Sequence, residues 1–139
     1  MKILILLLLI FLATPIFSSA QSLVGHYKSA EIKTWDRVKY FLKAVNNYVV
    51  GSELYLYKDS SFKKISCGNI LQGKWHQDKH EIVLHVTSNE YRLESLRKAG
   101  KKPEVRTGLI HYTIEDELLT QVFKSNTGGK VLEALYKIE

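Results

Sequence analysis

The chain has 139 residues, of which 20 are Lys or Arg and 14 are Asp or Glu, so its formal net charge is +6. This length fits one domain, because domains typically contain about 100–150 residues. It excludes a two-domain enzyme, a solenoid and a polytopic membrane protein. A chain of this size can bury a core of its own without a metal or disulfide staple.

The first twenty residues have the composition of a secretory signal peptide. Lys2 supplies the positive start, an apolar run extends from Ile3 to Leu12, and small residues precede Gln21. The run is too short to cross a hydrocarbon core of about 30 Å, although an uncleaved anchor is the alternative. We therefore expect a signal peptide at 1–20 and an exported domain at 21–139, periplasmic or extracellular and not membrane-spanning after cleavage.

Cys67 is the only cysteine of the chain, so it cannot form an internal disulfide. We interpret it as a buried, inert thiol, because free cysteines are usually buried. A nucleophile or a disulfide to another chain is the alternative, and the sequence does not decide between them.

A short strand is predicted over 22–28, followed by one amphipathic helix between Ser29 and Val49. Apolar residues recur in that helix at spacings of three and four. These residues are Ile32, Trp35, Val38, Leu42, Val45 and Val49. Such a stripe usually covers a core, and a membrane-surface helix is the alternative.

From residue 53 onward the apolar period changes to two, which is typical of strands. We predict strands at 53–58, 61–66, 70–77, 80–88, 90–95, 105–114, 117–124 and 131–138. Short turns separate them, which favours a mainly β fold. The expected architecture is an antiparallel up-and-down barrel of eight or nine strands, with the helix after the first strand.

The hairpin around Asp78-Lys79 allows a register prediction. With those two residues as the turn, Trp75 faces Ile82 and Gly73 faces Leu84, which puts apolar residues on one face. A glycine at such a position suits a sharp bend in a closed sheet.

The sequence contains no recognisable catalytic or metal-binding constellation. It has no Gly-x-Ser-x-Gly elbow and no His-Glu-x-x-His, and its five histidines lack the spacings of zinc ligands. His76 and His80 are four residues apart but flank a predicted turn. We therefore expect no enzyme activity, catalytic residue, metal or cofactor.

A basic segment precedes the predicted strand at 105–114. Its cations are Arg92, Arg97, Lys98, Lys101, Lys102 and Arg106. A solvated loop is the simpler interpretation. Contact with an anionic envelope surface is the functional one. Export makes a nucleic-acid partner unfavourable.

Aromatic residues on the predicted strands are the candidate ligand-binding residues. They are Tyr55, Tyr57, Trp75, Tyr91 and Tyr112, with Trp35 and Leu42 of the helix as a lid. A barrel lumen lined in this way can hold one apolar ligand. A barrel of about eight strands can equally be filled by its own side chains.

The series Leu54-x-Leu56, Asp59-Ser60-Ser61-Phe62, Cys67-Gly68-Asn69, Gly73-Lys74-Trp75 and Ile82-x-Leu84 resembles small exported bacterial proteins of the lipocalin-like (calycin) type. Gly25-His26-Tyr27 is similar to the first-strand Gly-x-Trp of lipocalins, with Tyr27 in place of Trp. Lys137 would then pack over Tyr27. The helix after the first strand is longer than the usual connection of that family.

This resemblance implies a barrel that binds a small apolar molecule. The expected function is therefore non-catalytic binding of a small hydrophobic or lipid-like ligand. The alternative is an envelope protein-interaction or inhibitor-like module with a packed barrel and no small ligand.

Overall fold

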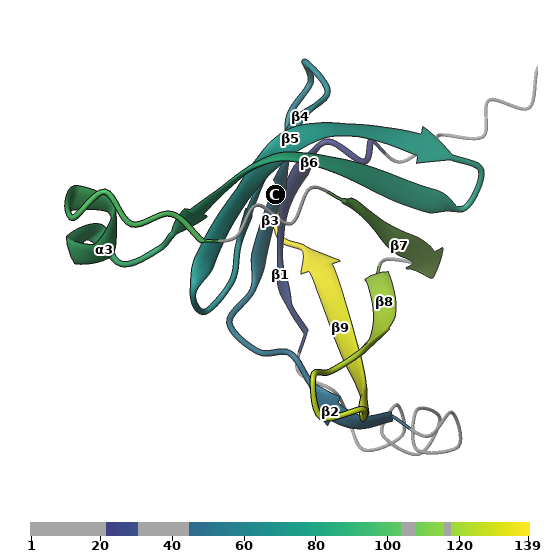
Figure 1. Cartoon of the computed structure of the whole chain (residues 1–139). Coiled ribbons are helices and arrows are strands. Elements are labelled where there is room, and N and C mark those ends of the chain that lie inside the picture. Colours follow the sequence, from purple (N-terminus) through teal and green to yellow (C-terminus); the bar gives the residue numbers. More distant parts are fainter. Residues whose placement is uncertain (1–21, 31–44, 104–107, 116–117) are drawn as a thin grey trace, which may run out of the picture.

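The computed structural model describes residues 22–30, 45–103, 108–115 and 118–139 (Figure 1). The predicted signal peptide, Trp35, Leu42 and Arg106 lie outside these residues. The described elements are β1 (Gly25–Ser29), β2 (Val45–Tyr48), β3 (Glu53–Leu56), β4 (Ser61–Ile65), β5 (Asn69–Asp78), β6 (Glu81–Tyr91), α3 (Glu94–Lys98), β7 (Leu109–Glu115), β8 (Leu118–Lys124) and β9 (Lys130–Lys137).

The sheet closes on itself. Strands β3 to β9 follow one another in chain order, β1 pairs with β3, and β1 also pairs antiparallel with β9. The result is a closed antiparallel barrel of eight strands, with β2 as a ninth strand parallel to β9. The predicted mainly β barrel is confirmed.

Strand β2 pairs with the part of the β9 edge that β1 does not cover. β1 pairs with β9 up to Ser29 opposite Leu135, and β2 then pairs with the stretch from Lys130 to Leu132. Val45 packs there against Leu132 and Ala134. Because β9 is buried from Val131 to Leu135, side chains on both of its faces are shielded from water.

The prediction of a helix between Ser29 and Val49 is wrong at both ends, where the structure has strands. Ser29 is the last residue of β1, and Val45 begins β2. Pairing with the edge of β9 overrides the helical spacing of the apolar residues, as tertiary contacts often do. Residues 31–44, the middle of that prediction, lie outside the described part of the chain.

The predicted strands at 80–88 and 90–95 are one strand, β6, which ends at Tyr91. A register shift opposite Gln72 and Gly73 marks a bulge, which lets β6 bend without a break. The chain then forms α3, the one α-helix among the described residues, which extends away from the barrel (Figure 1). The expected strand at 90–95 is therefore wrong beyond Tyr91.

The β5–β6 hairpin keeps the predicted face but not the predicted register. Its turn residues are Lys79 and His80, and Trp75 lies opposite Leu84 instead of Ile82. Lys79 has a positive φ of 53° in this turn. A shift by two residues leaves the same side chains inside, so alternation alone does not distinguish the two registers.

The barrel interior is apolar along most of its length. The buried cluster consists of Tyr27, Leu54, Leu56, Phe62, Ile82, Leu84, Val86, Tyr112, Leu119 and Leu135. These residues alternate along their strands with outward-facing ones, as a closed sheet requires.

The residues before β1 fold against one end of this core. Leu23 packs on the cluster, and its carbonyl oxygen accepts a hydrogen bond of 2.7 Å from the Tyr27 hydroxyl. Lys137 is the register partner of Tyr27, and its amine donates to the carbonyl of Ser22. A Cβ at Gly25 would lie only 2.5 Å from Cε of Lys137, so Lys137 lies over this glycine.

Gly73 on β5 lies directly against the backbone of β6. A Cβ at this position would lie 1.8 Å from the carbonyl oxygen of His85 and 2.9 Å from Phe62. We expect Gly73→Ala to lower the free energy of unfolding by about 1–3 kcal/mol or more, because the backbone of β6 must move. Urea denaturation measures this loss.

Gly68→Ala is the matched control, because a Cβ at Gly68 meets nothing within 4 Å. Equal stability of the two variants would contradict the close approach of β5 and β6.

Candidate functional site inside the barrel

A buried ion pair crosses the interior of the barrel. The Lys64 amine on β4 lies 2.7 Å from Oε2 of Glu133 on β9. The two side chains are only 9% and 1% exposed. They are 69 residues apart in the chain, so the barrel closure brings them together.

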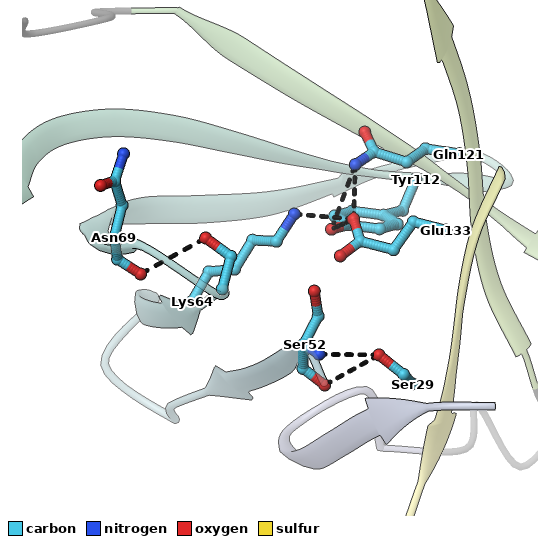
Figure 2. A network of polar contacts seen from close by, with 8 residues as sticks. Ser29, Ser52, Lys64, Asn69, Tyr112, Gln121 and Glu133 are labelled. Atoms are coloured by element: carbon cyan, nitrogen blue, oxygen red, sulfur yellow. Dashed lines mark hydrogen bonds and ion pairs between the residues drawn. The ribbon is translucent and has the colours of Figure 1, made fainter. Parts of the chain in front are cut away.

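Two more polar groups converge on the same carboxylate oxygen, Oε2 of Glu133. The Tyr112 hydroxyl and the Gln121 amide each donate a hydrogen bond of 2.6 Å to it. The Lys64 amine also lies 5.5 Å from the centre of the Tyr112 ring. Figure 2 shows these four side chains, from β4, β7, β8 and β9, directed toward one point.

Strand alternation explains why charged residues point inward here. Lys64 follows Phe62 by two residues on β4, and Glu133 lies between Val131 and Leu135 on β9. Residues two apart share a face, so each charge follows the apolar residues into the interior. The sequence analysis missed both residues, although a charge within an alternating apolar stretch was the available signal.

The surroundings of Glu133 determine its ionisation. Burial is the largest single influence and opposes the charged form. The charge and hydrogen bond of Lys64, the hydrogen bond from Tyr112 and the nearby Ser52 hydroxyl together outweigh burial and lower the pKa of Glu133. Burial, followed by the charge of Glu133, raises the pKa of Tyr112 well above its ordinary value, so its hydroxyl remains a donor.

Ser52 is held beside this network by its own backbone. Its amide donates to Oγ of Ser29 at 2.8 Å, and its carbonyl accepts from the amide of Ser29 at 2.9 Å. These contacts fix the start of β3 against the end of β1. The Ser52 side chain itself is free of them and is buried.

The two strands next to the network, β7 and β8, are paired over only part of their length. The ladder between β7 and β8 extends from Glu115 opposite Leu118 to Thr113 opposite Thr120 and includes no further pair among the described residues. The next residues, Tyr112 and Gln121, are the two that reach Glu133. Figure 1 shows β7 and β8 diverging with distance from the pair Glu115 and Leu118.

Two of the predicted ligand-binding aromatics lie at the core. Tyr112 is fully buried in the interior network. Trp75 packs partly buried against the core cluster, and its ring N–H donates to the carbonyl of Tyr57 at 3.1 Å. Tyr91 is half-buried at the end of β6, opposite Asn69.

Tyr55 and Tyr57 lie on the opposite face from Leu54 and Leu56, because successive residues of an extended chain face opposite sides. The Tyr55 ring stacks on His26 at 4.0 Å, and its hydroxyl donates to Glu53 at 2.6 Å. That hydrogen bond raises the pKa of Tyr55 to about 12. The structure therefore places these two tyrosines away from Tyr112.

Cys67 is exposed, which corrects the expectation of a buried thiol. It lies in the bend between β4 and β5. Its Sγ lies 3.8 Å from the carbonyl oxygen of Val50.

The basic segment lies at and beside α3. Its described cations are Arg92, Arg97, Lys98, Lys101 and Lys102, all exposed. Lys98 pairs with Glu94 at 3.0 Å. Leu93, at the start of α3, is 61% exposed among these charges.

No group of three His, Cys, Asp or Glu side chains in the described part of the chain is arranged to hold a metal ion. Among the same residues, no helix has the length and apolar character needed to cross a membrane.

Comparison of the chain with protein-family models, curated proteins and solved structures gives no match. The closed eight-stranded antiparallel barrel is compatible with a lipocalin-like fold.

We expect Glu133→Gln to lower the free energy of unfolding by about 3–5 kcal/mol, because the buried Lys64 loses its counter-charge. The double variant Lys64→Met, Glu133→Leu should recover most of that loss. The double variant should remain about 1–3 kcal/mol less stable than the unsubstituted chain, because the buried Tyr112 hydroxyl has lost its acceptor. Chemical denaturation of the three proteins gives these values.

The same set of proteins tests the pKa of Glu133. A lowered folded-state pKa stabilises the protein fully above the ordinary value of 4.5, and this contribution is lost as the pH falls through the folded-state value. The stability of the native chain relative to the double variant should therefore fall below pH 4.5. A pH-independent difference would contradict an ionised Glu133.

Proposed function

We propose that this chain is an exported, non-catalytic binding protein of the bacterial lipocalin-like type, which takes a small hydrophobic or lipid-like molecule into its barrel. The charged network inside the barrel is the observation that carries this proposal. Stability alone does not account for a buried ion pair, because apolar residues of similar volume often stabilise a core as well or better. Lys64 and Glu133 instead provide a polar point within an apolar interior, the usual composition of a small-molecule site.

The short β7–β8 ladder, which ends after three residue pairs, supports the same proposal. Ligand exchange requires part of the wall to yield, and wall segments with few hydrogen bonds open most readily. Phe123 on β8 is 41% exposed beside this region and offers an apolar contact at its outer edge. The composition of residues 1–20, which is typical of a signal peptide, supports the proposed export.

The test is saturable binding of a neutral apolar fluorophore, N-phenyl-1-naphthylamine, to the chain from residue 21 onward. Ile110 on β7 is half-buried and packs against the core cluster. We expect Ile110→Trp to weaken binding about tenfold or more, because the added ring occupies interior volume next to the site.

Leu109→Trp is the matched control, because Leu109 is the preceding residue of β7 and 56% exposed. Absence of saturable binding to the unsubstituted chain, or equal affinity of the two variants, would contradict an interior site. Circular dichroism confirms that each variant is folded.

A second candidate function is that of an envelope interaction module that acts through its surface, with a packed barrel and no small ligand. The observation that favours it is the tip around α3, where the exposed Leu93 lies among five cations. An apolar side chain within a basic surface is suited to an anionic envelope surface.

We expect binding to vesicles of equal phosphatidylglycerol and phosphatidylcholine. The double variant Arg97→Glu, Lys101→Glu should lose at least about 30-fold in affinity, because it removes two positive charges and adds two negative ones. Each cation near such a surface contributes about 1 kcal/mol. Sedimentation with vesicles measures the affinity of each protein. The control is Lys58→Glu, Lys124→Glu, which changes two exposed lysines outside this segment, one in the β3–β4 turn and one on β8. An equal loss of affinity in the control would show only a net-charge effect.

A further inference from the structure

Two polar atoms beside the interior ion pair have no hydrogen-bond partner among the described residues. They are Oγ of Ser52 and Oε1 of Glu133, and both belong to residues that are 1% exposed. Figure 2 shows the Ser52 hydroxyl pointing toward that second carboxylate oxygen. The hydroxyl is close enough to help lower the pKa of Glu133, yet it does not reach hydrogen-bond geometry.

These atoms define the chemistry of a complementary group. A carboxylate oxygen only accepts hydrogen bonds, whereas a serine hydroxyl both donates and accepts. A single hydroxyl group placed between them satisfies both, because it donates to Oε1 of Glu133 and accepts from Oγ of Ser52. Buried polar atoms are satisfied in nearly all native structures, so the pair indicates a partner of this kind.

We propose that the barrel recognises its ligand through a neutral hydroxyl, so that the ligand class is an apolar molecule with an alcohol head group. This inference rests on the proposed function and specifies its ligand. The apolar part of the molecule packs against the interior cluster, and the hydroxyl lies between Ser52 and Glu133.

Charge distinguishes this ligand from two similar ones. Lys64 and Glu133 neutralise each other, so an uncharged head group keeps the interior neutral. A carboxylate would be repelled by Oε1 of Glu133 and would leave that oxygen without a donor. An ammonium would add a buried positive charge that no described acidic side chain beside Lys64 and Glu133 balances.

The position of the site is suited to a ligand that enters through the side of the barrel, between β7 and β8. Tyr112 and Gln121 contact Glu133 and are the first residues beyond the end of the β7–β8 ladder. A molecule that enters where these strands diverge reaches the network first.

The experiment displaces N-phenyl-1-naphthylamine with three ligands of equal chain length, decan-1-ol, decanoic acid and decylamine, at pH 7. We expect decan-1-ol to compete at a concentration about tenfold lower than the acid or the amine. Ser52→Ala should reduce this preference to near equality. The backbone contacts of Ser52 with Ser29 do not involve its hydroxyl, so this variant keeps its fold.

Ser95→Ala is the matched control, because Ser95 is exposed on α3, and it should keep the preference. Equal competition by the three ligands, or an unchanged preference in Ser52→Ala, would overturn the hydroxyl inference and leave a site filled by water only. The interior site itself would then still stand, because the fluorophore binds. Failure of the fluorophore and of all three ligands to bind would overturn both proposals.

Discussion

The ion pair between Lys64 and Glu133 is the interaction on which the interior of this barrel depends. Each charge lies out of water, so neither is tolerable without the other. The pair requires β4 and β9 to face one another across the barrel, which the pairing of β1 with β3 and with β9 achieves. Tyr112 and Gln121 then complete the hydrogen bonds of one carboxylate oxygen.

Neighbouring strands around this ion pair are joined by different numbers of ladder pairs. β9 is held on one edge by β1 and β2 and on the other by β8 over seven residue pairs. The seam between β7 and β8 has three pairs. Under the proposed function, the weakly paired boundary between β7 and β8 is where a molecule enters without unfolding the barrel, and the polar network lies just inside it.

The barrel, most strands and one residue of the interior polar network, Tyr112, were predictable from the sequence, because alternation of apolar residues is a local signal. Sequence reasoning did not predict the β5–β6 register, because a shift by two residues keeps the same face inside. It missed the pairing of Lys64 with Glu133, since the contact joins residues 69 apart and exists only once the sheet closes. Val45 was assigned to a helix because its spacing is helical, whereas the edge of β9 determines its conformation.

The most direct test of a ligand site inside this barrel is native mass spectrometry of the exported chain, purified gently from the envelope of its own cells. The account predicts a discrete added mass that disappears on organic extraction and belongs to an uncharged, hydroxyl-bearing apolar molecule. A single species at the mass of the cleaved polypeptide, in protein that also fails to take up decan-1-ol, would contradict it.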